Sequence, residues 1–235
     1  MIPPADFIPL AEQNGLVPGL TAWALRKALR QRSAWSKAGW QVDVAVNLSV
    51  LDLRDEGLVG RVTGTLRDAG VDPSHLWLEV TETSVMSDPA RARRVLDQLH
   101  GIGVRVSIDD FGTGQSSLAY LQTLPASEVK IDRSFVARFT AQPRDGAIVR
   151  AAVTLAHDLG LSAIAEGVET AQALTQLCRL GCDNAQGFFI ARPLPPDAVL
   201  PWVRKEQATL SARCAGDAAA RRARAAGRVP AVRTV

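Results

Sequence analysis

Hydrophobic and polar positions follow two alternating periods along the chain up to Gln207, and these periods predict strands and helices in turn. Short apolar runs rich in β-branched residues predict six strands, at 42–49, 75–82, 104–110, 127–132, 161–166 and 184–191. A segment with helical spacing follows each strand, at 55–70, 88–101, 116–124, 144–160, 170–181 and 195–207. Two more helical stretches, 5–15 and 19–39, come first. Apolar strands separated by helices predict a parallel sheet covered by helices, an α/β fold.

Polar side chains occur at or near the carboxyl end of every predicted strand. They are carboxylates, amides and one lysine: Asn47, Glu79, Glu82, Asp109, Asp110, Lys130, Asp132, Glu166, Glu169 and Gln186. The carboxyl ends of parallel strands share one edge, and in a barrel they converge on one mouth. Turns and helix caps would explain one or two of these residues, since Asp is common at both. Six successive strands with such residues indicate a shared site.

The types of side chain in this set indicate metal chemistry. Oxygen donors without His or Cys select hard cations such as Mg²⁺, Mn²⁺ or Ca²⁺. Several carboxylates around one point repel one another unless more than one ion binds. Two ions about 3.5–4 Å apart, bridged by Asp109 and with Asp110 on one of them, would activate a water for attack on a phosphate ester. Lys130 would orient that nucleophile or stabilise developing charge; alternatively, it is a structural lysine paired with a carboxylate.

Length, composition and charge indicate what kind of protein carries this site. At 235 residues and 47% hydrophobic composition, the chain is large enough for one full core, which we place at 1–206. We expect the Ala/Arg-rich tail, 207–235, to be disordered. Its six arginines against one aspartate give it a net charge of +5, which accounts for the net positive charge of the chain, and we expect it to bind no specific nucleic acid. Three cysteines give neither a disulfide framework nor a zinc spacing, and no run spans a membrane, so we expect a cytoplasmic protein. The three histidines are interpreted as ordinary surface or boundary residues.

Six short segments in order carry a resemblance to a known family. They are "NLS" (47–49), "LEVTE" (78–82), "SIDDFGTG" (107–114), "VKIDRSFV" (129–136), "AIAEGVET" (163–170) and "QGFFIARPLP" (186–195). From about Ile2 to Trp202 the chain resembles the EAL domains, bacterial phosphodiesterases that linearise cyclic-di-GMP to pGpG on a modified TIM (β/α)₈ barrel. The resemblance implies that fold, cyclic-di-GMP as the bound nucleotide, and two Mg²⁺ or Mn²⁺ ions.

The resemblance also assigns roles to individual residues. It implies that the metal ligands are Asn47, Glu79, Asp109, Asp110 and Glu166. It implies that the groups acting near the catalytic water are Lys130, Glu166, Glu169 and Gln186. Glu82 matches the glutamate that anchors the loop after the strand Val104–Asp109, a loop that also makes dimer contacts in the family. Arg192 and Pro193 match substrate-binding positions.

Two departures from the family pattern bear on activity. Gln115 stands where the family loop usually has an aromatic residue. The sequence begins with a segment that resembles the one just after the family's Glu-Ala-Leu motif, so we expect a barrel with six of eight strands that lacks one glutamate ligand. Three hypotheses follow: a phosphodiesterase, slow as given, whose amino-terminal part is missing; a degenerate EAL protein that binds nucleotide or a partner without hydrolysis; or a poorly folding remnant.

Overall fold

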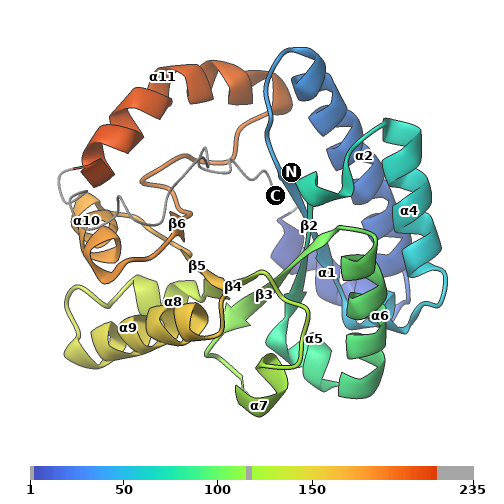
Figure 1. Cartoon of the computed structure of the whole chain (residues 1–235), viewed down its shortest axis with the longest axis horizontal. Coiled ribbons are helices and arrows are strands. Elements are labelled where there is room, and N and C mark those ends of the chain that lie inside the picture. The colour runs from blue at the N-terminus through green and yellow to red at the C-terminus, as the bar shows by residue number, and fades with distance from the viewer. Residues whose placement is uncertain (1–2, 115–117, 216–235) are drawn as a thin grey trace. The chain divides into compact units, whose positions relative to one another are not determined.

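A computed structural model of the chain describes residues 3–114 and 118–215. Within these ranges six strands form a sheet whose order follows the sequence: β1 Val44–Leu48, β2 Leu76–Thr81, β3 Arg105–Phe111, β4 Glu128–Ile131, β5 Ser162–Ala165 and β6 Asn184–Ala185 (Figure 1). The pairs β1–β2, β4–β5 and β5–β6 are parallel. The predicted α/β fold with a parallel sheet is confirmed.

Helices occupy the predicted helical segments, and additional short helices lie between them. The long helices are α1 Pro4–Gln13, α2 Val17–Lys37, α4 Leu58–Ala69, α6 Pro89–Gly101, α9 Pro143–Asp158, α10 Ala171–Leu180 and α11 Pro196–Ala215. The short ones are α3 Val50–Arg54, α5 Glu82–Met86, α7 Leu118–Leu121, α8 Arg133–Val136 and a 3₁₀ turn, Pro73–His75. Side-chain caps explain why several short helices begin where they do, since Ser49, Thr81 and Asp132 each accept a hydrogen bond from a backbone amide of the first turn.

The sixth strand is much shorter than the predicted span of 184–191. After Ala185 the backbone leaves the sheet and crosses the segment that follows β5: the Val168 amide donates to the Gln186 carbonyl (2.9 Å), and the Phe189 amide donates to the Val168 carbonyl (3.0 Å). The amides of Ile190 and Ala191 then both donate to the Gly187 carbonyl, which turns the chain. The apolar run "GFFIA" therefore forms a turn rather than a strand.

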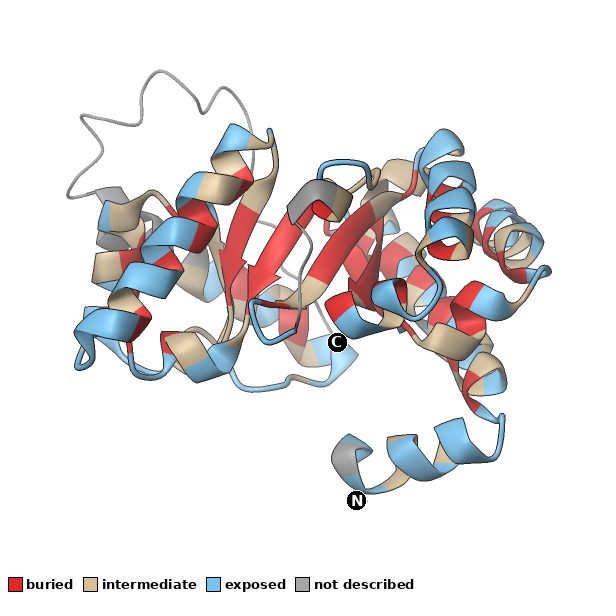
Figure 2. Cartoon of the chain, turned by 90° about the horizontal axis from the view of Figure 1, so that it is seen from below, coloured by how far each residue is buried: buried red, intermediate tan, exposed pale blue. Residues whose placement is uncertain are grey.

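The chain divides into two compact units, the first of which comprises Met1–Ile108 and Gly114–Ala126. Its core includes the fully buried Leu76, Leu78 and Val80 of β2, together with Leu29 of α2 and Leu96 of α6. The helices bury one face and expose the other, the amphipathic pattern of helices that cover a sheet (Figure 2). Helix α1 has no buried residue among those described and exposes Leu10.

Asp43 joins the amino-terminal ends of three strands in this unit. Its carboxylate lies 2.7 Å from His75 Nδ1, accepts a hydrogen bond from Trp77 Nε1 (3.1 Å) and pairs with Arg105 Nη1 (3.4 Å). The Arg105 guanidinium also lies over the Trp77 ring, 5.2 Å from its centroid. His75 is therefore a partly exposed boundary residue, as the sequence predicted, but it also belongs to a polar cluster that the sequence did not reveal.

The second unit comprises Asp109–Thr113 and Ser127–Thr234. Its core includes Ile131 of β4, Ala163 and Ala165 of β5, and Val149 of α9, all fully buried. His157 Nε2 lies 2.8 Å from Asp183 Oδ2, which also accepts a hydrogen bond from the Ala163 amide (2.9 Å). His157, like His75, thus has a carboxylate partner that the sequence did not reveal.

Two further predictions concern the tail of the chain and segments that could span a membrane. Helix α11 continues to Ala215, so the first residues of the segment 207–235 are helical rather than disordered; residues 216–235 lie outside the described ranges. Among the described helices, none combines the length and apolar character needed to cross a lipid bilayer. The domain boundary at residue 206 stays a prediction.

Candidate metal centre

Lys130 is the central charge of a group of carboxylates in the second unit. Its side chain is 3% exposed, and Nζ lies 3.0 Å from Asp109 Oδ2 and 2.7 Å from Glu166 Oε1. These residues come from the ends of three strands: Asp109 from β3, Lys130 from β4 and Glu166 directly after β5. The hydrogen bond from the Glu166 amide to the Ile131 carbonyl (3.1 Å) fixes the backbone beside this contact.

Asp109 and Asp110, the adjacent carboxylates that the sequence singled out, lie where β3 turns. The Asp110 amide donates to Asp109 Oδ1 (2.9 Å), and Asp110 itself has a φ of +54°. A residue other than glycine in this left-handed region is strained, although Asp tolerates it better than most. Because of this backbone conformation, Asp109 and Asp110 can direct their carboxylates to the same site although they are neighbours in sequence.

Asp109, Asp110 and Glu166 each offer a carboxylate oxygen, and these oxygens all lie within 4.8 Å of one another. We call these three residues the acidic cluster. An all-oxygen donor set this close suits a hard divalent cation, whose charge would offset the mutual repulsion. The residues therefore fit a hard divalent cation of the kind that the sequence predicted.

The electrostatics around Asp110 show how crowded the negative charge is without a cation. Partial burial is the main cause that raises the pKa of Asp110 above its ordinary value. The neighbouring carboxylates of Asp109 and Asp132 raise this pKa further, while Lys130 and Arg133 act in the opposite direction. Lys130 thus offsets part of the negative charge of the cluster.

The other predicted site residues of the second unit lie outside the acidic cluster. Gln186 is half-buried and its carbonyl accepts the Val168 amide, which ties it to the segment after Glu166. Glu169 is exposed. Arg192 and Pro193 are exposed too, and the Arg192 guanidinium lies over the ring of the exposed Phe188, 4.8 Å from its centroid.

The first unit pairs two further predicted ligands. Asn47 and Glu79 stand directly opposite each other in the parallel register of β1 and β2. Asn47 is the exposed position in an otherwise buried strand, and Glu79 is 3% exposed. The parallel register therefore places these two predicted ligands beside each other in the sheet.

Glu82 lies at the start of α5 and faces Gly114. Both carboxylate oxygens are buried and neither has a hydrogen-bond partner within the described ranges. A Cβ atom on Gly114 would lie 2.6 Å from Glu82 Oε1, so the glycine allows the backbone to close over the carboxylate. Residues 115–117, the rest of the loop that Glu82 is predicted to anchor and that includes Gln115, lie outside the described residues.

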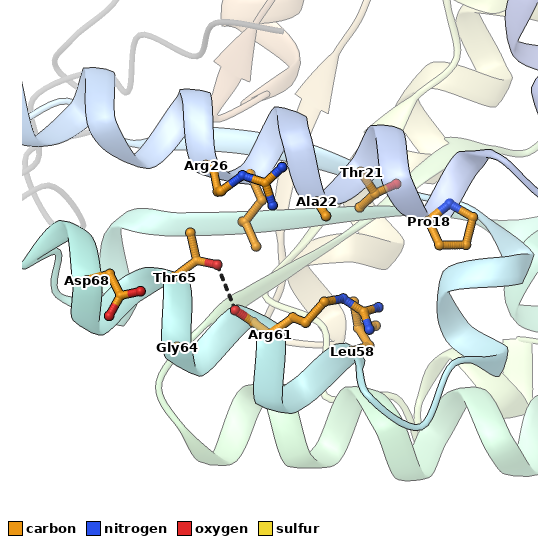
Figure 3. Close-up of a pocket in the computed structure, with 10 residues that line it drawn as sticks. Pro18, Thr21, Ala22, Arg26, Leu58, Arg61, Gly64, Thr65 and Asp68 are labelled. Atoms are coloured by element: carbon orange, nitrogen blue, oxygen red, sulfur yellow. Dashed lines mark hydrogen bonds between the residues drawn. The ribbon is translucent and has the colours of Figure 1, made fainter.

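A separate hollow of about 290 Å³ lies between α2 and α4 of the first unit (Figure 3). Its two threonines already have partners: the Thr65 hydroxyl donates to the Arg61 carbonyl (2.7 Å), and the Thr21 hydroxyl donates to Asp52 Oδ2 (2.9 Å). We therefore interpret it as a gap between packed helices and look for chemistry at the strand ends.

The EAL domain model matches residues 1–193, and the chain belongs to the EAL domain family. A Pseudomonas aeruginosa protein described as a bifunctional diguanylate cyclase/cyclic di-GMP phosphodiesterase, MucR, is 46% identical over 206 residues, which cover 86% of this chain and 30% of MucR. The chain spans about a quarter to a third of the length of the curated relatives it matches. The resemblance inferred from the six motifs is confirmed.

Solved structures agree with this assignment. The structure described as "PaMucR Phosphodiesterase, c-di-GMP complex" is 47% identical, with a TM-score of 0.81 over 84% of this chain and 81% of that chain. The EAL domain of Mycobacterium smegmatis DcpA is 40% identical, with a TM-score of 0.76 over 81% of this chain and 86% of that chain. The fold is therefore that of EAL domains, the TIM-barrel-like class predicted from the motifs.

Proposed function

We propose that the chain hydrolyses cyclic-di-GMP to linear pGpG with two divalent ions, Mg²⁺ or Mn²⁺. The observation that supports this most is the buried Lys130 held between Asp109 and Glu166, beside Asp110. The ammonium stands beside a set of oxygen donors suited to divalent cations. Membership of the EAL family and a relative solved in a c-di-GMP complex support the substrate.

Each predicted residue has a role in this proposal. The residues that would hold the ions are Asn47, Glu79, Asp109, Asp110 and Glu166. When bound, such ions act as Lewis acids on the phosphate and lower the pKa of a water. The Lys130 ammonium, which donates to Asp109 and Glu166, would orient the attacking water and stabilise charge that develops on the phosphate oxygens.

The remaining residues would complete the site around that chemistry. Glu169 and Gln186 would hold water near Glu166, since Gln186 is tied by its backbone to the segment that carries both glutamates. Glu82 would fix the loop after β3 through its contact with Gly114. Arg192 and Pro193 would contact the nucleotide from the exposed turn after β6. We also propose a cytoplasmic location and a homodimer formed through the loop after β3.

The test is a measurement of pGpG formation by the full chain with Mg²⁺ or Mn²⁺, with and without a chelator. Glu166→Ala is expected to lower turnover about a hundredfold or more, whereas Glu206→Ala, on α11, leaves it unchanged. Metal-dependent hydrolysis that responds in this way supports the proposal. Binding of cyclic-di-GMP without any pGpG would contradict it and favour the alternative predicted from the sequence, a nucleotide-binding regulator that does not hydrolyse its ligand.

A further inference from the structure

Helix α8 follows the strand that carries Lys130 and contacts both turns that carry the acidic cluster. Asp132 caps this helix by accepting hydrogen bonds from the Ser134 amide (2.9 Å) and from the Ser134 hydroxyl. Val136, 1% exposed, packs the helix into the second unit. The cap and the buried valine hold α8 in a fixed place relative to β4.

Phe135 of α8 lies against the turn that follows Asp109 and Asp110. A Cβ atom on Gly112 would lie 3.2 Å from Phe135 Cε2 and 3.8 Å from its Cζ, so the ring edge is in contact with the glycine backbone. Gly112 has a φ of +96°, and the Thr113 amide donates to the Asp110 carbonyl (3.2 Å) to close the turn. The ring therefore limits the conformations that this turn can adopt.

Arg133, two residues earlier, lies against the turn that follows Glu166. A Cβ atom on Gly167 would lie 2.6 Å from Arg133 Cβ and 3.3 Å from its Cα, and Gly167 has a φ of +67°. The backbone of α8 and the backbone just after Glu166 thus approach as closely as a glycine permits. One short helix contacts the segments that carry all three carboxylates of the acidic cluster.

We propose that α8 positions the acidic cluster and that Phe135 is a positioning residue of the metal centre. The strained Asp110 supports this, because a non-glycine residue at positive φ persists only when its surroundings hold it there. Phe135, packed against Gly112, supplies that restraint from outside the cluster. Without the ring, the turn relaxes, and the carboxylates of Asp109 and Asp110 lose their common direction.

The test compares Phe135→Ala with Phe139→Ala in the full chain. Phe139 is a matched control because it is a phenylalanine of the same unit, four residues away and 6% exposed, and belongs neither to α8 nor to the acidic cluster. The first readout is hydrogen exchange of the backbone amides 109–114, measured well below the melting temperature. The second is the affinity for Mn²⁺, measured by the electron paramagnetic resonance signal of the free ion.

We expect Phe135→Ala to speed exchange of the 109–114 amides about tenfold and to weaken Mn²⁺ binding by about tenfold or more, as loss of supporting residues around metal ligands does. Phe139→Ala is expected to change both by less than about threefold, although it lowers stability more, since Phe139 is the more buried. Phe135→Leu, which keeps part of the apolar contact and folds more readily, is expected to give intermediate values.

Two results would overturn the inference: unchanged exchange of 109–114 in Phe135→Ala and Phe135→Leu, or the same increase in Phe139→Ala. The catalytic consequence of this inference depends on the proposed function, but the exchange measurement does not. Wild-type protein that binds Mn²⁺ and forms no pGpG would reject the hydrolysis, while the comparison of the two phenylalanines would still decide the role of α8.

Discussion

The Lys130 ammonium lies 3.0 Å from the Asp109 carboxylate, although the two residues come from different strands of the second unit. With only 3% of the lysine side chain exposed, water does little to screen the pair. The same ammonium also reaches Glu166 at 2.7 Å, so one positive charge stabilises two carboxylates. Lys130 is therefore an internal counter-ion for the acidic cluster as well as a candidate for the chemistry.

Replacing Lys130 by alanine is expected to affect both stability and turnover. Loss of a buried partner leaves two carboxylates uncompensated, so the metal-free protein loses roughly 3 kcal/mol of unfolding free energy. Saturating Mn²⁺ restores part of this loss because the cation replaces the missing charge, but pGpG formation stays nearly abolished. Urea unfolding with and without Mn²⁺ measures the first effect. Lys205→Ala, on an exposed part of α11, is the control; equal losses in both variants would contradict the prediction.

The sequence predicted the strands and the chemistry at their ends because both follow from local patterns. A β-branched run that ends in carboxylates requires no knowledge of distant segments, and Asp109, Lys130 and Glu166 lie together as expected. The contacts that hold these residues are not local. Phe135 against Gly112, and Gly187 against Val168, join residues separated along the chain, and no periodicity predicts which glycine a distant backbone approaches.

Pairing between residues far apart in the sequence also explains why the carboxylate partners of two histidines were not predicted. Asp43 lies 32 positions before its partner His75, and Asp183 lies 26 positions after His157. Each histidine, taken alone, has no partner at ligand spacing, so the sequence favoured an ordinary boundary position. Only the folded chain brings each imidazole to a carboxylate, since His75 lies just before β2 and His157 lies on α9.

Alanine at position 187 is expected to lower the stability of the protein, whereas alanine at position 64 is expected to raise it. A Cβ atom on Gly187 would lie 2.2 Å from both the amide nitrogen and the carbonyl oxygen of Val168, and backbone atoms cannot move aside cheaply. Gly187→Ala is therefore expected to cost about 3 kcal/mol and to lower turnover by displacing Gln186. Gly64, inside α4, has open space around its Cα, so Gly64→Ala gains about 0.5–1 kcal/mol. Thermal and urea unfolding distinguish the two; a neutral Gly187→Ala would refute the close approach.

Asp43→Ala is expected to destabilise the first unit by about 2–3 kcal/mol, because Trp77 Nε1, His75 Nδ1 and Arg105 lose a shared charged acceptor. Asp68 provides the comparison, since its side chain is 78% exposed and lies 3.8 Å from Arg67 Nε. Asp68→Ala is expected to change stability by less than about 0.5 kcal/mol. Urea unfolding followed by tryptophan fluorescence measures both variants. If the two substitutions cost the same, the polar cluster does not stabilise the strand ends.

Cys182 is expected to make the protein less stable in alkali. Burial, helped by the nearby Asp183 carboxylate, raises the pKa of the Cys182 thiol to about 12, from an ordinary value of 9.0. The unfolded chain therefore releases this proton first: the stabilisation is complete below about pH 9 and is lost as the pH rises toward 12, at about 1.4 kcal/mol per pH unit.

Urea unfolding at pH 7.5, 9 and 10 tests this prediction on wild type, Cys182→Ser and Cys178→Ser. Serine at 182 can still donate to the carbonyls of Ala163 and Asn184, which the thiol contacts at 3.4 and 3.2 Å, but it does not titrate. The decline in stability above pH 9 is expected to be shallower in Cys182→Ser than in wild type and unchanged in Cys178→Ser. Identical pH slopes in all three proteins, or rapid alkylation of native Cys182 at pH 9, would show that burial does not keep this thiol protonated.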